Sequence, residues 1–356
     1  MEKVRIGIIG VGGIANGVHI PKYLECEDCV ITAVCDIDEK RLNETGDRLN
    51  IPESARFTDY CDLINSGLVD AVDIATSNDV HVEISLAALD AGLPVSVEKP
   101  IGITFEESLA LRKKSEETGL PVFVCFSWRY RGTAQYMKKL IDDGEIGEIY
   151  HIYINCIKDS GLWEGRRLEW RFDEKRAGTG VLCDLGSHMF DAIRFFGKEI
   201  ESVSCDRGII VKKRQLLDSD DWADVTTDDW ANATCVLDGG ANATVILSRT
   251  AVAENNTTEF YVTGSKGALK LSSVKGETLE LCSGEDLKTK TFKTLEIPAE
   301  FSGANQSRSF INIVKGIKDG FASDIFAGIK SQAAVDAAKL SSETGKKILI
   351  EEMFKI

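Results

Sequence analysis

The first third of the chain alternates between short apolar runs and longer stretches in which apolar residues recur at helical spacing. The apolar runs are Val4–Ile9, Val30–Cys35, Ala71–Ala75, Val95–Glu98 and Val122–Phe126. The helical stretches between them reach Leu24 and cover Glu39–Leu49, Val80–Ala91 and Phe105–Thr118. Strands that alternate with helices predict a parallel sheet with helices on both faces. Gly92 and Gly119 follow two of these stretches and fit helix C-caps.

From about residue 123 the pattern changes, and we therefore expect two domains, residues 1–122 and residues 123–356, with the C-terminal helix packing back on the first. Two alternating runs flank Asp238-Gly239-Gly240, which is typical of a hairpin turn. The predicted strands are Ile149–Ile157, Ala231–Leu237, Ala241–Ser248, Glu259–Thr263, Ala268–Leu271, Thr278–Cys282 and Ile348–Ile350. The predicted helices are Gln135–Asp142, Val181–Phe196, Phe310–Lys318 and Ile325–Thr344. Helices are expected to cover one face of this sheet and a subunit interface the other.

Length and charge narrow the class of protein. A chain of 356 residues is too long for one ordinary core and suits two domains. Its formal net charge of −15 argues against nucleic acid or an anionic membrane as a partner. No apolar run approaches the roughly 20 residues of a membrane span, and the strand expected from Val4 argues against a signal peptide. We therefore expect a cytoplasmic protein.

The cysteines do not indicate a metal site. Several of the ten lie inside apolar patterns, as reduced, buried cysteines usually do. Cys26-Glu27-Asp28-Cys29 is the only CxxC pair, and no second pair or histidine lies near it in the sequence. Because a structural zinc ion needs about four ligands, we expect no metal there.

A glycine-rich turn follows the first predicted strand. Gly10-Val11-Gly12-Gly13-Ile14-Ala15 fits the G-x-G-x-x-G/A pattern between a strand and a helix. The first glycine permits a tight turn, the second lets the backbone approach a pyrophosphate, and Ala15 lets the helix pack closely. Free N–H groups at a helix N-terminus would meet the phosphates. The pattern predicts a bound dinucleotide; a glycine turn without a ligand is the alternative.

Polar residues after the next strands indicate which dinucleotide binds and where. Asp36 ends the second strand, and a carboxylate there would accept hydrogen bonds from ribose hydroxyls and repel a 2′-phosphate, which favours NAD over NADP. It could equally be a helix N-cap. Ile37 follows it, and Arg41 is placed either to stack on adenine or to reach a 2′-phosphate. Thr76-Ser77-Asn78 and His81 follow the third strand, where ligands bind in such sheets, and Asn78 or Asp79 could also cap the next helix.

Two further segments carry candidate catalytic groups. Glu98-Lys99-Pro100 closes a buried strand, so an ammonium is held beside the expected dinucleotide, where it can stabilise alkoxide character. Glu98 would orient Lys99 or contact the cofactor. Asp184 and His188 lie four residues apart on a predicted helix and therefore on one face, where the imidazole suits a general base. The alternatives are a surface ion pair for Glu98-Lys99 and a structurally satisfied histidine for His188.

The order and spacing of these segments resemble the glucose-fructose oxidoreductase / inositol dehydrogenase (Gfo/Idh/MocA) family over nearly the whole chain. The resemblance implies a Rossmann domain followed by an α/β domain with an open, mostly antiparallel sheet. It also implies NAD(P)-linked oxidation or reduction of sugars, polyols and related hydroxy compounds, and a homodimer or homotetramer that packs through the open sheet. The chain has Ser77 where the family often has proline, and Ser127-Trp128-Arg129-Tyr130-Arg131 where it often reads Asn-Arg-Arg.

The resemblance and residue chemistry together suggest a substrate-binding set. Trp128, Arg129 and Tyr130 lie in the segment that faces substrate in relatives, and Trp170-Arg171 matches a pair close to the nicotinamide. Aromatic and guanidinium groups suit sugar faces and hydroxyls, which adds Trp163 and Arg166 to the set. Loop packing and surface charge are the alternative for Arg166 and its neighbour Arg167. His19 and His151 are expected to be structural, with His19 close to the glycine turn.

We therefore expect an NAD-dependent oxidoreductase acting on a secondary hydroxyl of a sugar, cyclitol or glycoside. His188 would be the general base and Lys99 would stabilise the reacting oxygen. The alternative is that Lys99 accepts the proton. One alternative is a net non-redox reaction, such as elimination or epimerisation, in which a tightly bound NAD is restored. Another is a nucleotide-dependent sensor that lacks catalysis.

Overall fold

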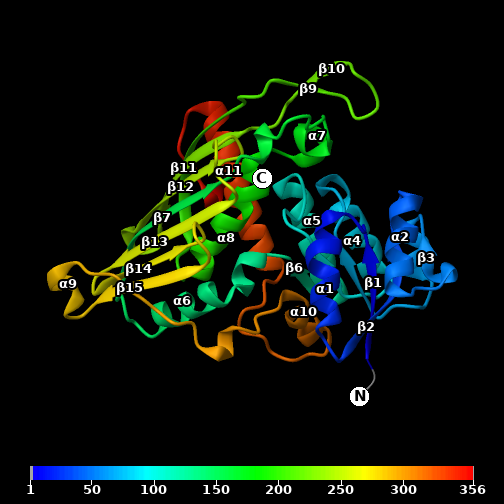
Figure 1. Cartoon of the computed structure of the whole chain (residues 1–356), viewed down its shortest axis with the longest axis horizontal. Helices are drawn as coiled ribbons and strands as arrows, with labels where there is room; N and C mark the ends of the chain where they lie inside the picture. Colours follow the sequence, from blue (N-terminus) through cyan, green and yellow to red (C-terminus); the bar gives the residue numbers. More distant parts are fainter. Residues whose placement is uncertain (1–2, 356) are drawn as a thin grey trace. The chain divides into compact units, whose positions relative to one another are not determined.

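The computed structural model describes residues 3–355, which form two compact units (Figure 1). The first unit contains the chain up to Phe126 together with Asn305–Ile329. The second contains Ser127–Ala304 and the chain from Lys330 onward. The later segment of the first unit includes α10 (Gln306–Val314) and the start of α11 (Ile325–Thr344).

The first unit is built on a six-stranded sheet whose order is β3-β2-β1-β4-β5-β6, with every pair parallel. The strands are β1 (Val4–Ile9), β2 (Cys29–Cys35), β3 (Arg56–Phe57), β4 (Ala71–Ile74), β5 (Val95–Val97) and β6 (Val122–Val124). Every residue of β4, β5 and β6 is buried, as expected for parallel strands that are covered on both faces. The expected domain boundary at residues 122 and 123 falls inside β6, which pairs with β5.

Helices connect these strands and pack against the sheet. They are η1 (Ala15–His19), α1 (Ile20–Leu24), α2 (Glu39–Leu49), η2 (Glu53–Ala55), α3 (Tyr60–Asn65), η3 (Asn78–Val80), α4 (His81–Asp90) and α5 (Phe105–Thr118). The α5 helix begins with a capping box between Thr104 and Glu107 and ends at Gly119, whose φ is +68°. Gly92 follows α4 with φ +84°, so both glycines take the left-handed conformation expected of them.

The second unit carries a nine-stranded sheet of order β16-β15-β14-β13-β7-β12-β11-β8-β17. The strands are β7 (Ile149–Ile157), β8 (Ile200–Gly208), β11 (Trp230–Leu237), β12 (Asn242–Ser248), β13 (Thr257–Gly264), β14 (Gly267–Ser272), β15 (Thr278–Ser283), β16 (Lys293–Thr294) and β17 (Ile348–Leu349). All neighbours are antiparallel except β7 and β12, which run parallel. The predicted hairpin at Asp238-Gly239-Gly240 joins β11 to β12. A separate two-stranded ribbon is formed by β9 (Lys213–Gln215) and β10 (Trp222–Asp224).

One face of this sheet is covered and the other is open. The α8 helix (Ser187–Phe195) packs on β7 and β8, and α6 (Gly132–Asp142) packs on β14 and β15 (Figure 1). On the opposite face Tyr153, Ile246 and Tyr261 remain partly exposed. The remaining helices are η4 (Ser127–Tyr130), η5 (Ser160–Leu162), η6 (Trp170–Phe172), α7 (Glu174–Ala177), η7 (Leu182–Gly186), η8 (Asp238–Gly240), α9 (Asp286–Thr289), η9 (Ala299–Phe301) and α12 (Ile350–Met353).

Candidate active site

The glycine turn after β1 contains two kinds of glycine. Gly10 has φ +86°, and a Cβ there would lie 2.7 Å from the carbonyl oxygen of Ala75, so this position excludes a side chain. At Gly12 and Gly13 no atom of the described chain lies within 4 Å of such a Cβ. The fold itself therefore does not require these two glycines. They leave open the space that a pyrophosphate needs beside a helix N-terminus.

Asp36 joins the end of β2 to this turn. It is buried, and its Oδ2 accepts the N–H of Val11 at 2.9 Å while its Oδ1 accepts the N–H of Asp38 at 2.9 Å. The N-cap of α2 is Asp38, which accepts the N–H of Arg41, so the alternative of Asp36 as N-cap is wrong. The Arg41 guanidinium lies 3.2 Å from Asp36 and 3.4 Å from Asp38. Arg41 is thus directed toward two carboxylates.

Two isoleucines present apolar surface beside these polar groups. Ile37, directly after Asp36, is 89% exposed, and Ile14 in the glycine turn is 39% exposed. An isoleucine this exposed gains nothing from the core of its own unit. Its position next to the carboxylate expected at a ribose suits an apolar contact with an adenine base.

The loop after β4 lies directly against the glycine turn. A Cβ on Gly10 would also lie 2.9 Å from Thr76 Cγ2, so Thr76 packs against that glycine. Ser77 is the N-cap of η3 and Val80 that of α4, so neither Asn78 nor Asp79 takes an N-cap position.

His81 is buried beneath this loop. Its Nδ1 lies 2.8 Å from the carbonyl oxygen of Pro100 and its Nε2 lies 3.3 Å from that of Thr76. Burial lowers the pKa of His81, so the ring is neutral at neutral pH and has one N–H to donate. The shorter distance favours donation to Pro100. His81 thus ties the loop after β5 to the loop after β4, and the structure gives it no open face toward a cofactor.

Glu98 and Lys99 differ in burial at the end of β5. Glu98 is buried, and its Oε2 accepts the backbone N–H of Lys99 at 3.1 Å. Lys99 is half-buried, and the Lys99–Pro100 peptide is cis. A buried glutamate excludes the alternative of a surface ion pair. Glu98 orients the backbone that carries the Lys99 ammonium, as the sequence suggested.

The candidate cofactor residues of the first unit follow strands that are neighbours in the sheet. The glycine turn, Asp36, the Thr76 loop and Lys99 come after β1, β2, β4 and β5, whose order is β2-β1-β4-β5. The carboxyl ends of parallel strands meet at one edge, and the strand order reverses between β1 and β4. Open α/β sheets bind ligands at such a switch point. The open space at Gly12 and Gly13 and the anchored carboxylate of Asp36 therefore fit a dinucleotide.

In the second unit, Asp184 and His188 lie on a helix that is otherwise buried. The helix begins with a π turn, η7, which contains Asp184, and continues as α8, which contains His188. From Thr179 to Ile193 these two residues alone are partly exposed. The described chain has one other π turn, η1 after the glycine turn, and single π turns often mark functional sites.

The structure adds Lys158 to the candidate residues. Lys158 directly follows β7, and its Nζ lies 2.7 Å from Asp184 Oδ2. Both side chains are partly exposed to solvent, so Lys158 is accessible on the same side as Asp184. No sequence pattern connects these two residues, because a lysine at a strand end is common on surfaces.

Trp128 and Arg129 lie in η4, which contacts α8, and both side chains are buried. Arg129 forms a bidentate pair with Asp191 of α8, with Nε to Oδ2 at 2.7 Å. Trp128 packs edge-on against Phe260. Arg129 is thus paired with α8, Trp128 packs on β13, and their contact with a substrate stays a prediction. Tyr130, the third residue of that set, is half-buried.

The loop before the helix holds the remaining candidates. Trp163 and Arg171 are exposed, and the Arg171 guanidinium lies 4.3 Å from the centre of the Trp170 ring. Arg166 donates to Glu169 and to the carbonyl oxygen of Ser160. Loop packing therefore accounts for Arg166. Arg167 likewise donates to the carbonyl oxygens of Leu216 and Ser219.

Two other expectations from the sequence concern burial and membranes. Cys35, Cys125, Cys156 and Cys235 are buried, as their apolar surroundings predicted. None of the helices within residues 3–355 is both long and apolar enough to cross a bilayer.

Comparison with known proteins supports this picture. Residues 4–126 match the NAD-binding Rossmann fold of an oxidoreductase family, and residues 134–270 match the GFO/IDH/MocA C-terminal domain. The chain is 26% identical to levoglucosan dehydrogenase of Pseudarthrobacter phenanthrenivorans, over 80% of this chain and 78% of the relative. It is 24% identical to myo-inositol 2-dehydrogenase of Thermotoga maritima, over 98% and 93%. A levoglucosan dehydrogenase solved with NADH shares the fold, with a TM-score of 0.88, 23% identity and coverage of 98% and 99%.

Proposed function

Because the chain belongs to the Gfo/Idh/MocA family of oxidoreductases, we propose that it transfers hydride between NAD and a secondary hydroxyl of a sugar, cyclitol or glycoside. The named relatives act on levoglucosan and myo-inositol, which supports a cyclic polyhydroxy substrate. When bound, NAD supplies the acceptor for the hydride that leaves the carbinol carbon.

One observation carries the assignment of the catalytic pair: Asp184 and His188 are the partly exposed positions of an otherwise buried helix segment. All other residues from Thr179 to Ile193 are buried, so these two side chains are the ones in this segment that a substrate could reach. An imidazole suits removal of a hydroxyl proton near neutral pH. The carboxylate of Asp184 then balances the charge that the imidazole gains.

We assign complementary roles to the other polar groups. His188 takes the hydroxyl proton, and the Lys99 ammonium donates a hydrogen bond to the same oxygen as negative charge develops on it. In the alternative assignment, Lys99 accepts the proton and His188 orients the hydroxyl. Lys158 keeps Asp184 in place through their 2.7 Å ion pair.

We further propose that NAD is preferred over NADP. Asp36 would accept hydrogen bonds from the ribose hydroxyls, and its carboxylate would repel a 2′-phosphate. Arg41 lies against Asp36 and Asp38, which supports a role in fixing these carboxylates over one in binding a phosphate. Gly10, Gly12, Gly13, Ile14, Ile37, Thr76, Ser77 and Asn78 complete the proposed cofactor site, and Trp163, Trp170 and Arg171 remain proposed contacts of the substrate and nicotinamide.

The direct test measures nicotinamide absorbance with purified protein, NAD⁺ and then NADP⁺, across hexoses, inositols and glucosides. A rise with NAD⁺ and one group of substrates supports the proposal and identifies the group. If absorbance stays flat while a sugar is converted, NAD is bound and restored in place, and the reaction is a net non-redox one. If NAD⁺ binds but no sugar is bound or converted, the protein is a sensor.

Replacing His188 separates catalysis from binding. We expect His188→Ala to lower kcat by about 10²- to 10⁴-fold, the usual contribution of a general base. The dissociation constant of NAD⁺ should stay within about twofold, because His188 does not belong to the first unit. His151→Ala is the matched control, since His151 is a partly exposed histidine on β7 that contacts Asn242. Equal activity of His188→Ala and the control would refute the assignment.

A further inference from the structure

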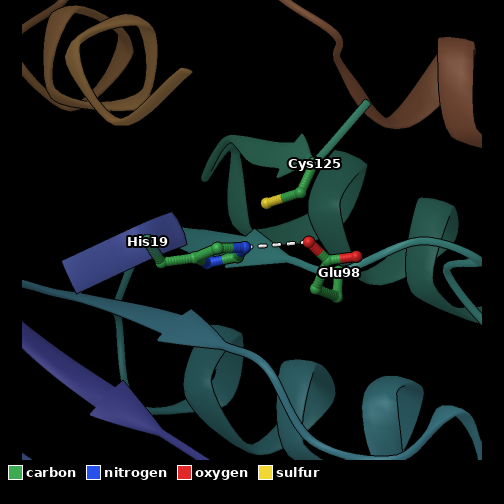
Figure 2. Close-up of side chains that lie close together, drawn as sticks. All are labelled: His19, Glu98 and Cys125. Atoms are coloured by element: carbon green, nitrogen blue, oxygen red, sulfur yellow. Dashed lines mark hydrogen bonds and ion pairs between the residues drawn. The ribbon is translucent and has the colours of Figure 1, made fainter. Parts of the chain in front are cut away.

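His19 lies in the first unit between two carboxylates, away from solvent. Its side chain is fully buried, its Nδ1 lies 2.9 Å from Asp73 Oδ1, and its Nε2 lies 2.8 Å from Glu98 Oε1. Figure 2 shows the imidazole directed at Glu98, with the Cys125 sulfur nearby. The three side chains come from different elements: η1 for His19, β4 for Asp73 and the end of β5 for Glu98.

The hydrogen-bond pattern fits a doubly protonated ring between two ionised carboxylates. A neutral imidazole has one N–H and could donate to only one of two facing carboxylates, whereas an imidazolium donates to both. Asp73 Oδ2 also accepts the hydroxyl of Tyr23 at 2.6 Å, so it is surrounded by donors. A buried carboxylate left without a donor would be costly, which favours the charged ring.

The other titratable groups in contact with this cluster are neutral. Burial raises the pKa values of Tyr23 and of Cys125 well above their ordinary ranges. Burial alone would lower the pKa of His19, but the charges and hydrogen bonds of Asp73 and Glu98 outweigh it and raise that pKa to about 10. The cluster thus holds one cation between two carboxylates.

A metal ion fits these atoms less well than a proton does. Ligand atoms of His19, Glu98 and Cys125 lie within 4.8 Å of one another, which would admit an ion. However, Nε2 and Oε1 are 2.8 Å apart, a hydrogen-bond distance. Two ligands held at about 2.0–2.1 Å on a tetrahedral zinc ion lie roughly 3.3 Å apart. The observed spacing therefore matches N–H···O contact.

We propose that His19 is a buried imidazolium that positions Lys99 through Glu98. One carboxylate oxygen of Glu98 is held by His19, and the other accepts the backbone N–H of Lys99. Asp73 holds the opposite side of the ring and so fixes its orientation. The inference rests on the proposed function in one respect, namely that Lys99 acts on the substrate. His19 itself is a positioning residue.

The protonation state is tested by ¹⁵N NMR of protein labelled at histidine. The chain has four histidines, so each resonance pair can be assigned from one His→Gln variant per site. We expect both ring nitrogens of His19 to carry protons from pH 6 to pH 9. In Glu98→Gln, which removes one carboxylate but keeps the shape, His19 should lose a proton within that range. An unprotonated ring nitrogen on His19 at pH 7 in the unaltered protein would overturn the proposal.

The positioning role is tested with His19→Gln and the matched control His151→Gln. A glutamine amide can donate to Glu98 but cannot serve Asp73 as well, and it carries no charge. We expect the ¹⁵N-labelled amide resonance of Lys99, assigned with Lys99→Arg, to move in His19→Gln and to stay in the control. If His19→Gln does not fold, Glu98→Gln should move the same resonance. An unmoved Lys99 amide would overturn the positioning role.

Kinetic measurements on His19→Gln test whether the positioning of Lys99 matters for turnover. Misplacement of a catalytic group costs on the order of 100-fold in rate, so kcat of His19→Gln should fall by about that factor while the dissociation constant of NAD⁺ changes little. The pH optimum should also shift upward, because loss of the imidazolium leaves more negative charge beside the Lys99 ammonium. An unchanged kcat and pH profile would argue against the proposal, as would stoichiometric zinc in purified protein that Cys125→Ser loses. If no sugar is converted by the unaltered protein, the proposed function fails while both NMR results still decide the state of His19.

Discussion

The Asp36 carboxylate is held in place by hydrogen bonds and an ion pair within the first unit. Its two oxygens accept the N–H groups of Val11 and Asp38, and Arg41 lies against it. These contacts fix the carboxylate at the end of β2 next to the glycine turn. A fixed negative charge discriminates between ligands that differ in charge better than a mobile one, because it cannot swing away from a phosphate.

Replacing Asp36 should change the choice of dinucleotide. In Asp36→Ala we expect NAD⁺ to bind about ten- to hundred-fold more weakly, since a hydrogen bond to a charged group contributes about 1.5–3 kcal/mol. The ratio of kcat/KM for NADP⁺ to that for NAD⁺ should rise. Asp59→Ala is the control: it removes the N-cap of α3 at about 1 kcal/mol but leaves that ratio unchanged. A ratio that stays the same in Asp36→Ala would count against the proposed site.

The His19 cluster should also make stability depend on pH. The native pKa of about 10 lies above the ordinary value of 6.5, so between these values the folded protein holds a proton that the unfolded chain releases. The contribution is complete below about pH 6.5 and is lost as pH rises toward 10. We expect the free energy of unfolding in urea to fall over this range more steeply in the unaltered protein than in His19→Gln. Parallel curves would exclude a charged His19.

At the scale of elements, the glycine turn contains one glycine that the fold needs, Gly10, and one that we expect only cofactor binding to need, Gly12. Gly12→Ala should leave Tm within about 2 °C, because an added Cβ meets no described atom within 4 Å, while NAD⁺ binding weakens at least about tenfold. Gly10→Ala should lower stability by more than about 1 kcal/mol, because of its φ of +86° and the clash with Ala75. Thermal unfolding and NAD⁺ titration of both variants check this. Normal NAD⁺ binding by Gly12→Ala would place the pyrophosphate elsewhere.

Elements with a strong apolar period were predictable from the sequence. The strand Ile149–Ile157 and the helix Ile325–Thr344 have the bounds that their patterns gave. In contrast, β8 was missed, because Ile200–Gly208 reads Ile-Glu-Ser-Val-Ser-Cys-Asp-Arg-Gly and offers few apolar residues to alternate. The ribbon of β9 and β10 was missed for the same reason. Neither π turn could be foreseen, since both lie within ordinary helical patterns.

The candidate site was predictable where residues are neighbours in sequence or end neighbouring strands. The glycine turn, Asp36 and Lys99 follow from the strand pattern alone. Contacts between distant residues did not follow from it: the pair Lys158–Asp184 and the pair Arg129–Asp191 depend on how strands and helices pack. Burial could not be predicted either: Trp128 and Arg129, whose residue types suit a sugar, are both buried.

At the scale of the whole molecule, the open face of the second unit's sheet exposes large apolar side chains to solvent. Tyr153 and Tyr261 are cross-strand neighbours with ring centres 5.9 Å apart, and Ile246 and Val236 extend this apolar surface. Exposed apolar patches of this kind mark interaction sites. We propose that a second copy of the chain covers it.

A charge on this face should break the assembly. We expect Tyr153→Glu to convert the oligomer to a smaller species in size-exclusion chromatography with light scattering, because burying an unpaired carboxylate costs several kcal/mol. Trp222→Glu is the control, since Trp222 is an exposed aromatic residue of the separate ribbon of β9 and β10. Equal masses for both variants and the unaltered protein would exclude this face as the interface.

The single parallel pair in that sheet has a consequence for how the chain folds. Strands β12 and β13 follow each other in the chain, and β7 lies between them, antiparallel to β13. Its other neighbour is β12, which it contacts in parallel. That contact closes a loop containing η7 and α8, and long loops close slowly because their entropy must be lost before the strands pair. The helix that carries Asp184 and His188 therefore lies in the chain segment between β7 and β12, the two strands of the parallel pair. We expect a newly made chain to order the segment that carries these two residues only once the strands on both sides of it, β7 and β12, have paired.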